Sequence, residues 1–452
     1  MPAAPPALPG THFSDSPLDR ALAMQLAGER DAALRWSASV IKHDPSIASA
    51  LIFTARLLAD AGRNEAAVEA FELGVKRAID AGNLPLAVAA VQDLRRLKKD
   101  AETQLDEIAG AFCAGSPRIT EASAADPPPL TAADDLEPLS SFLTGPALLS
   151  KVTEIIHEAS KLYESAGDSV PLIAPLPLFS SLEKPALRAL IGAFEMITVA
   201  AGEAVIEEGS EGAEAYIVAR GELEVRKAAQ SEDDPPLTLA RLTGGALFGE
   251  MALLARAPRA ASVVACRPSI LLVARRDELE TVARSRPDVG VELAAHCRRR
   301  MVANLVRTSP VLLAVPGEER PALVERFETK VFEKGDRLIV QGNDPAGLHL
   351  IASGEVAVVR REGDEPFVIS TLGPGQVVGE VALVLRRKAN ADVVAVHPTI
   401  TLHLPQEEFL SMVRDHPAIL QGLYLLAVER DEETTLAIAN STTTVGDEYI
   451  IV

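Results

Sequence analysis

The feature that most constrains the fold of this chain is a long internal repeat in its later part. Phe194 recurs as Phe327, and the spaced glycines that follow it recur at the same offset of 133 residues. The matched positions are Gly202, Gly209, Tyr216 and Gly221-Glu222 in the first copy, and Gly335, Gly342, His349 and Gly354-Glu355 in the second. Gly249-Glu250 recurs as Gly379-Glu380 at an offset of 130, so the second copy lacks three residues of the loop at 231–236. The chain therefore contains two copies of one domain.

Each copy has the pattern of a small domain built from short strands. Runs of apolar and β-branched residues flank Gly221 in the first copy and Gly354 in the second, and glycine at such a corner supplies the positive φ that a hairpin requires. The expected strands are 215–219 and 222–226 in the first copy, and 348–352 and 356–360 in the second. Many short strands separated by glycine turns predict a double sheet related to the jelly roll. A helix is expected after each copy, over 289–307 and 418–433.

The N-terminal region carries a shorter repeat. Ala27-Gly28 and the residues after it recur as Ala61-Gly62 at an offset of 34 residues, and a similar break follows at Ala81-Gly82-Asn83. This period is typical of helix–turn–helix repeats of the tetratricopeptide kind, and Pro45 lies between the two units, where a helix must stop. We therefore expect antiparallel helical hairpins, which either pack as a plain helical domain or form a concave surface for a partner protein.

A chain of 452 residues is too long for one ordinary core, and its composition marks the boundaries. Residues 114–146 are rich in Ala, Ser, Asp and Pro, which is typical of a flexible linker. The expected segments are a disordered tail (1–14), helical-hairpin repeats (15–113), the linker (114–146), a connecting helix (147–170), β-roll domains (171–308 and 309–433) and a C-terminal tail (434–452). The predicted fold class is α+β and multidomain, with helical-hairpin repeats followed by two jelly-roll-like β-roll domains that have flanking helices.

A compact motif in the first copy, LFGEMALLARAPRAASV over 247–263, contains residues suited to an anionic ligand. A short helix starting near Glu250 would present free backbone N–H groups and the positive end of its dipole, which favours a phosphate. Gly249 removes a side chain where a ligand must approach the backbone. Arg259 supplies a positive charge on a two-pronged donor, and Glu250 supplies an acceptor for a hydroxyl group. The alternative is plain structure: a helix-initiating turn and a surface ion pair between Glu250 and Arg259, which contributes little.

The motif, FGExAL followed by PRAA inside a repeated glycine-spaced β-roll, resembles the phosphate-binding cassette of the cyclic-nucleotide-binding domain family. That family includes the regulatory subunits of cAMP-dependent kinases and catabolite-activator-type sensors, and the resemblance covers 175–308 and, more weakly, 311–433. It implies that Ala252 and Ala260 bind the phosphate through backbone N–H groups and that Ser262 lines the pocket. The expected site residues are Phe248, Gly249, Glu250, Met251, Ala252, Leu253, Pro258, Arg259, Ala260, Ala261 and Ser262. The resemblance favours cAMP over cGMP, because Ala260 lacks the hydroxyl group that often accompanies cGMP in the family.

The second copy departs from this pattern. Residues 378–383, VGEVAL, keep the start of the motif, but Lys388 stands at the proline position, Ala389 at the arginine position and Asp392 at the serine position. A phosphate there would lack its charged partner and would meet a carboxylate. One of the basic residues at 386–388 could swing in, although each is offset along the chain. We therefore expect a structural copy that binds no cyclic nucleotide and that packs against the first copy or presents a surface to a partner.

Charge and composition exclude several function classes. The formal net charge of -20 argues against nucleic-acid binding, and the basic runs at 95–99 and 298–300 are expected to be solvated helix faces. The chain has neither a signal-peptide pattern nor an apolar run of about 18 residues, so we expect a cytoplasmic protein with no membrane contact. Cys113, Cys266 and Cys297 are far apart in sequence and are expected to be buried small residues in a reducing compartment.

No catalytic or metal-binding motif accompanies these features, so we expect neither an enzyme nor a metal site. About 20 residues follow the second copy, too few for a helix-turn-helix DNA-reading domain. We expect a cyclic-nucleotide-sensing adaptor that couples ligand binding in the first β-roll to a protein partner bound by the helical repeats or the second β-roll. The alternative is a scaffold that needs no ligand. A homodimer is left open, and the Ala/Arg/Leu/Pro-rich usage is typical of a GC-rich bacterial genome.

Overall fold

The computed structural model describes residues 16–97, 100–120, 136–165, 171–228, 236–254, 258–362 and 365–446. The chain divides into two compact units. The first consists of Met1–Val205, Tyr216–Phe248 and Ser262–Glu292, and the second of Ile206–Ala215, Gly249–Ala261 and Leu293–Val452. The first unit therefore holds the helical region and most strands of the first β-roll. The second unit holds the second β-roll and the two segments of the first copy that contain Glu214, Gly249 and Arg259.

Six helices begin the first unit and form the antiparallel hairpins that the shorter repeat predicts. They are α1 (Pro17–Leu26), α2 (Arg30–His43), α3 (Ala48–Asp60), α4 (Asn64–Asp80), α5 (Leu84–Leu97) and α6 (Glu102–Phe112). Gly28, Gly62 and Gly82 follow the ends of α1, α3 and α4 with φ angles of 85°, 74° and 68°, a conformation that costs glycine little. α3 and α4 pack closely because a Cβ at Gly74 would be only 2.8 Å from the side chain of Ile52.

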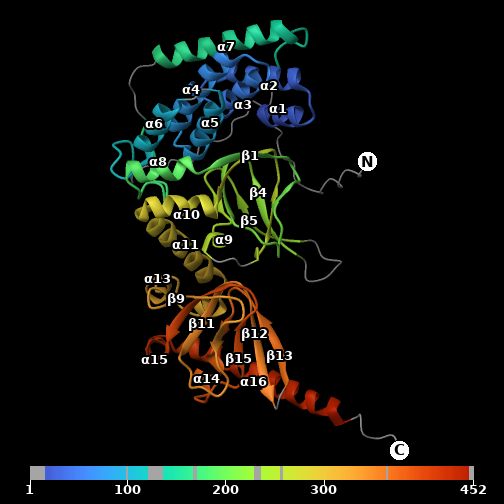
Figure 1. Cartoon of the computed structure of the whole chain (residues 1–452), viewed down its shortest axis with the longest axis vertical. Coiled ribbons are helices and arrows are strands. Elements are labelled where there is room, and N and C mark those ends of the chain that lie inside the picture. Colours follow the sequence, from blue (N-terminus) through green and yellow to red (C-terminus); the bar gives the residue numbers. More distant parts are fainter. Residues whose placement is uncertain are drawn as a thin grey trace, which may run out of the picture. The chain divides into compact units, whose positions relative to one another are not determined.

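A seventh helix, α7 (Gly145–Ser165), packs along α2 and α4, as Figure 1 shows. Its buried residues recur at helical spacing: Leu148, Val152, Ile155, Ile156 and Ala159. Near its end, Tyr163 donates a hydrogen bond of 3.0 Å to Asp80. The helix begins two residues before the connecting helix expected over 147–170. The expected tail over 1–14 and the middle of the expected linker lie outside the described residues.

The strands of the first copy form two four-stranded sheets, which confirms the double-sheet fold. One sheet has the order β1 (Glu195–Val199), β8 (Ser269–Arg275), β3 (Glu214–Arg220) and β6 (Leu247–Phe248), and the other β2 (Ala204–Ile206), β7 (Ser262–Ala265), β4 (Leu223–Lys227) and β5 (Leu237–Leu242). Gly221 makes the corner between β3 and β4 with a φ of 116°, and a Cβ there would overlap the side chain of Ser269. α8 (Lys184–Gly192) and α10 (Arg276–Ser285) flank the strands in the sequence.

A buried ion cluster ties α1 to the first β-roll within the first unit. Asp19 on α1 lies 2.6 Å from Arg220 and 3.3 Å from Arg267. The three side chains are only 5%, 13% and 17% exposed, so this is not a surface ion pair. Burial lowers the pKa of Arg220, and the charge of Asp19 opposes that shift. The helical region is therefore anchored to the corner of the roll by charge as well as by packing.

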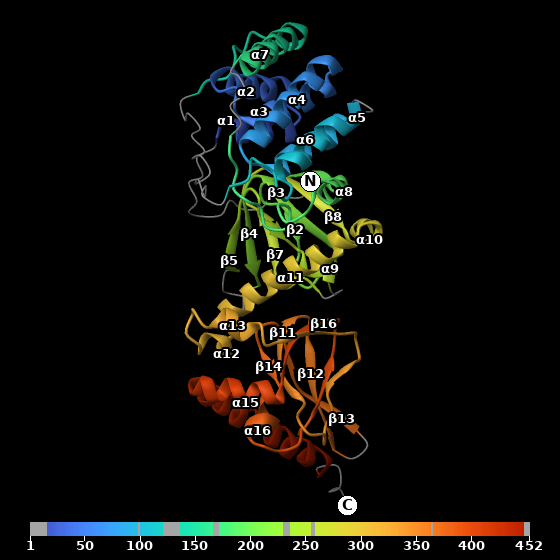
Figure 2. The ribbon, with the colours of Figure 1, turned by 90° about the vertical axis from the view of Figure 1, so that its left-hand side faces the viewer.

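The second unit contains the second β-roll, again with two four-stranded sheets. Their orders are β14 (Val377–Val378), β11 (Gly347–Ser353), β16 (Thr399–Pro405) and β9 (Glu328–Phe332), and β10 (Arg337–Ile339), β15 (Asp392–Ala395), β12 (Val356–Glu362) and β13 (Glu365–Leu372). The helices described with it are α12 (Pro310–Leu313), α13 (Arg320–Val324), α14 (Glu380–Val384), α15 (Gln406–Asp415) and α16 (Pro417–Gly446). α15 and α16 lie side by side in Figure 2. α16 is longer than the helix expected over 418–433 and runs into the segment 434–452 that was expected as a tail.

The core of the second roll also takes in α11 (Pro287–Thr308). Met301 and Leu305 of that helix pack with Leu402, Phe409 and Leu423, all at most 3% exposed. Burying these side chains stabilises the contact by about 1.5 to 3 kcal/mol for each one. The helix after the first copy is therefore a structural part of the second.

Two sequence expectations concern burial. Cys113 and Cys297 are buried as expected, but Cys266 is only partly buried because it lies in the turn after β7. In the described part of the chain, no helix combines the length and the apolar character needed to cross a membrane.

Candidate functional site

The second unit brings Arg259, Gly249 and Glu214 together. Nη1 of Arg259 donates to the carbonyl oxygen of Gly249 at 3.0 Å, and Nη2 donates to that of Glu214 at 2.9 Å. The Glu214 carboxylate lies 3.4 Å from Nη2. The arginine side chain is only 7% exposed, so its position is fixed by these contacts rather than by solvent. A buried guanidinium with both terminal nitrogens held is a rigid positive group.

The backbone around Arg259 explains two of the repeated glycines. Gly209 N donates to the Arg259 carbonyl at 2.8 Å, and Arg259 N donates to the Ser210 carbonyl at 2.9 Å. Gly249 has a φ of 74°, and a Cβ there would be 2.9 Å from Nη1 of Arg259. A Cβ at Gly212 would be 2.5 Å from Nη2. Any side chain at Gly212 or Gly249 would therefore displace the guanidinium.

Glu250, the second charged residue of the motif, is 4% exposed. Its Oε1 lies 3.2 Å from Nε of Arg300 on α11, and its carbonyl oxygen lies 3.9 Å from the Cys297 thiol. Burial, together with the nearby Glu250 charge, raises the pKa of Cys297 to about 12. The alternative of a surface ion pair between Glu250 and Arg259 is wrong, because both are buried and each has other partners.

The helix of the motif forms where it was expected. α9 (Met251–Leu254) starts directly after Glu250, and the Leu253 amide donates to the Glu250 carbonyl at 3.0 Å. Met251 packs against the core of the second roll. Pro258 and Ala261 are partly buried and Ala260 is exposed. The side chain of Ala252 and residues 255–257 lie outside the description.

Phe248 and Ser262, the first and last expected site residues, belong to the first unit. Phe248 is 5% exposed and its ring stacks on Tyr216, with the centroids 5.2 Å apart. Ser262 begins β7 and pairs with Arg226 in the register of β4. The part that these residues and those of the motif play in ligand binding stays a prediction.

In the second copy, Ala389 occupies the backbone position of Arg259. Gly342 N donates to the Ala389 carbonyl at 2.8 Å, and Ala389 N donates to the Asn343 carbonyl at 2.9 Å, which reproduces the frame of the first copy. Glu214 corresponds to Gly347, where a Cβ would overlap the carbonyl oxygen of Leu404. The second copy therefore lacks the arginine and has no room for a carboxylate at the position of its acidic neighbour.

The other charged pair of the first copy is kept in the second. Glu380 is 2% exposed, and its Oε1 accepts from Nη1 of Arg430 on α16 at 2.5 Å. The same nitrogen donates to the Val377 carbonyl at 2.6 Å. Burial raises the pKa of Glu380, and the Arg430 charge opposes that shift. The two pairs, Glu250–Arg300 and Glu380–Arg430, are related by the same offset of 130 residues.

The remaining charges of the second motif are already paired. Asp392 is 1% exposed, accepts from the Gln341 amide at 2.8 Å and binds Arg361 at 2.5 Å. Arg387 is exposed and pairs with Asp431 of α16. The basic residue that could have replaced the missing arginine therefore has another partner.

The sequence analysis missed Glu214, Arg300 and Arg430. Arg300 was expected on a solvated helix face, yet it binds Glu250, and Arg298 beside it donates to the Phe327 carbonyl at 3.0 Å. The signal for Arg300 and Arg430 was available, because they recur at the offset that relates the two Gly-Glu pairs. Within the described ranges, no group of three or more metal-ligating side chains comes together.

Comparison with known proteins agrees with the repeat. The family model described as "Cyclic nucleotide-binding domain" matches residues 196–286 and 329–416. A cAMP-dependent protein kinase type II regulatory subunit from Drosophila melanogaster is 32% identical over 242 residues, which cover 54% of this chain and 60% of that protein. A cAMP-dependent protein kinase regulatory subunit from Yarrowia lipolytica is 30% identical over 243 residues, with coverage of 53% and 60%. The chain thus spans about 60% of the length of these curated relatives.

Solved structures show a similar but looser likeness. The regulatory domain of Toxoplasma gondii PKA, crystallised with cAMP, is 25% identical, with a TM-score of 0.27 and coverage of 56% of this chain and 92% of that one.

Proposed function

Because the chain carries two cyclic nucleotide-binding domains, we propose that the first binds cAMP and that the protein is a cytoplasmic regulatory adaptor controlled by that ligand. The observation that carries the proposal is the buried guanidinium of Arg259, held by the carbonyls of Gly249 and Glu214. A cyclic nucleotide has one negative phosphate group. A fixed arginine fork is the side chain that recognises such a group best, because it supplies both charge and directed donors.

The rest of the motif supports the same ligand. The Glu250 carboxylate is an acceptor for the ribose 2′-hydroxyl, and the backbone amides of Ala252 and Ala260 are donors for the phosphate oxygens. Ala260 offers no hydroxyl group to a guanine, which favours cAMP over cGMP. The proposal needs no charge from the rest of the protein, whose formal net charge is -20.

The contacts of Glu250 and Met251 supply a route from ligand to partner. Glu250 binds Arg300 of α11, and Met251 packs against the core that α11 shares with the second roll. A ligand that draws on Glu250 would compete with Arg300 and change how α11 is held. Such coupling requires that the two positions of α11 differ in their affinity for the ligand.

The output of this switch is a protein partner. The helical hairpins α1 to α6 are one surface for it, because stacked hairpins present an extended face, and the second roll is the other. We infer no enzymatic activity and no nucleic-acid or membrane ligand for the chain.

A ligand-independent scaffold is the second candidate. Ala389 and Asp392 favour it, because they show that a β-roll of this chain folds without an intact phosphate site. The first roll differs in keeping Arg259 buried with its partners, and an unused buried charge is costly to maintain.

Calorimetric titration of the full chain with cAMP and with cGMP tests the proposal. We expect saturable binding of cAMP, weaker binding of cGMP, and slower amide hydrogen exchange or a changed exchange pattern in residues 293–308 when cAMP is bound. Arg387→Ala, which removes an exposed arginine of the second copy, is the matched control and should bind cAMP like the unchanged chain. No heat and no shift in melting temperature with either nucleotide would overturn the proposal and favour the scaffold.

A further inference from the structure

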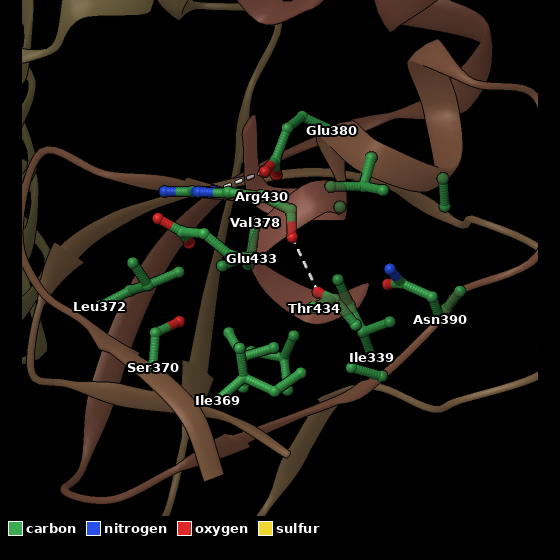
Figure 3. Close-up of a pocket in the computed structure, with 17 residues that line it drawn as sticks. Ile339, Ile369, Ser370, Leu372, Val378, Glu380, Asn390, Arg430, Glu433 and Thr434 are labelled. Carbon is green, nitrogen blue, oxygen red and sulfur yellow. Dashed lines mark hydrogen bonds and ion pairs between the residues drawn. The ribbon is translucent and has the colours of Figure 1, made fainter. Parts of the chain in front are cut away.

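The second β-roll contains a pocket at the place where the first copy has its motif, and Figure 3 shows its side chains. Its volume is about 540 Å³, part of which is open to solvent. This is within the range of about 300 to 1,000 Å³ that is typical of small-molecule sites. The loss of Arg259's counterpart has therefore not been accompanied by collapse of the cavity.

The pocket has no cation that could serve a phosphate. Its charged lining residues are Glu380, Arg430 and Glu433, so carboxylates outnumber guanidinium groups. Arg430 is bound to Glu380 at 2.5 Å, as the dashed line in Figure 3 shows, and its charge is thereby neutralised. Ala389 contributes only a methyl group to the wall. An anionic ligand would meet excess negative charge here and would lose affinity.

Glu433 strengthens this difference between the copies. It lines the pocket from α16, whereas the residue 130 positions earlier on α11 is Ala303. The second copy has thus lost a positive charge at position 389 and gained a negative one at position 433. Both changes act in the same direction, against a phosphate.

The rest of the wall suits the uncharged part of a ligand. Apolar side chains make up most of it: Ile339, Val358, Ile369, Leu372, Val378 and Val393. Figure 3 shows Ile369 on the opposite side of the pocket from Glu380 and Arg430. Ser370, Asn390 and Thr434 add polar groups along the sides. A ligand with an apolar ring at one end and hydroxyl groups at the other would match this division.

We propose that the second β-roll binds an uncharged, hydroxyl-bearing ring compound of the nucleoside class, with its hydroxyl groups on Glu380 and Glu433 and its ring among Ile339, Ile369 and Val393. The proposal goes beyond cAMP binding in the first roll and does not depend on it. It gives the two rolls different ligands: one with a phosphate charge and one without. Because Arg430, Glu433 and Thr434 all come from α16, such a ligand would also stabilise that helix.

Titration of the full chain with adenosine, guanosine and cAMP tests this inference. The Arg259→Ala variant is used so that the first roll does not contribute. We expect one nucleoside site per chain, and we expect cAMP to bind there at least about tenfold more weakly than the better nucleoside. Absence of binding by both nucleosides overturns the proposal, and so does cAMP binding of equal strength.

Two variants of neighbouring residues on β13 locate the site. Ile369 lines the pocket, whereas Val368 beside it is 59% exposed, because successive side chains of a strand point to opposite faces. Ile369→Trp should fill the pocket and weaken nucleoside binding by about tenfold or more, and Val368→Trp should leave it unchanged. Equal effects of the two substitutions would contradict the assignment. Thermal melting of each variant shows whether the roll still folds.

Ala389→Arg tests the role of charge in the same pocket. It restores a guanidinium beside the carbonyls of Gly379 and Gly347, where the first copy holds Arg259. We expect the second roll of this variant to bind cAMP, with the order of preference between cAMP and nucleoside moved by about tenfold or more toward cAMP. An unchanged order of preference in a folded variant would overturn the claim that missing charge decides the ligand.

Discussion

Replacement of Arg259 by alanine tests the charge on which the first site depends. The side chain is 7% exposed and has both terminal nitrogens bonded to carbonyl oxygens at 2.9 and 3.0 Å. Alanine removes the charge and the two-pronged donor but leaves the backbone frame, because Ala389 adopts the same hydrogen bonds in the second copy. The variant should therefore fold and lose ligand affinity.

The expected magnitude follows from burial. Removing one partner of a buried, hydrogen-bonded charge pair costs about 2 to 5 kcal/mol, which weakens binding by about 30-fold to a few thousand-fold. The free protein should lose about 1 to 3 kcal/mol of stability, because the carbonyls of Gly249 and Glu214 lose their donors. Arg259→Lys keeps the charge but not the fork, so we expect a smaller loss of about tenfold in affinity.

Calorimetry with cAMP measures the affinity, and thermal melting in the absence of ligand measures the stability of the same samples. Arg387→Ala is the control, because that arginine is exposed and pairs with Asp431 on the second roll. An Arg259→Ala variant that binds cAMP within about threefold of the unchanged chain would refute the reasoning, since less than about 0.7 kcal/mol would then depend on this side chain.

Three further outcomes follow from buried groups. Asp19→Ala should lower stability by about 3 kcal/mol because it leaves Arg220 and Arg267 without a carboxylate, and equilibrium unfolding measures this; a loss below about 1 kcal/mol would contradict it. Burial lowers the pKa of His349 to about 3, so unfolding takes up a proton as the pH falls below the ordinary histidine value, and stability should decrease by about 2 kcal/mol between pH 7.5 and pH 5. His349→Tyr, which copies Tyr216 of the first roll, should remove that dependence, and an unchanged pH profile would exclude this histidine as its source. The Cys297 thiol, with a pKa of about 12, should resist alkylation at pH 8 until the chain unfolds, so rapid labelling of the native protein would contradict its burial.

The architecture was predictable because it depends on repeated local signals. The glycine corners at Gly221 and Gly354 have the positive φ angles that the hairpins require, and the breaks at Gly28 and Gly62 end helices as the repeat predicts. Ala389 was assigned to the arginine position by alignment of the two copies, and the shared backbone frame bears this out.

The partners of the charged groups were not predictable in the same way. Glu214 reaches Arg259 from a segment 45 residues away, and Arg300 reaches Glu250 across 50 residues. Periodicity within one element does not specify such pairs, because they depend on how separate elements pack. The pocket of the second roll was also missed, since loss of an arginine predicts loss of phosphate binding but does not predict whether the cavity closes.

The number of cAMP molecules bound per chain tests the central claim most directly. Equilibrium dialysis of the full chain at saturating cAMP should give one per chain, and none for Arg259→Ala at the same concentration. Two per chain, or one that survives in Arg259→Ala, would contradict the account, because the second roll would then bind the phosphate without an arginine.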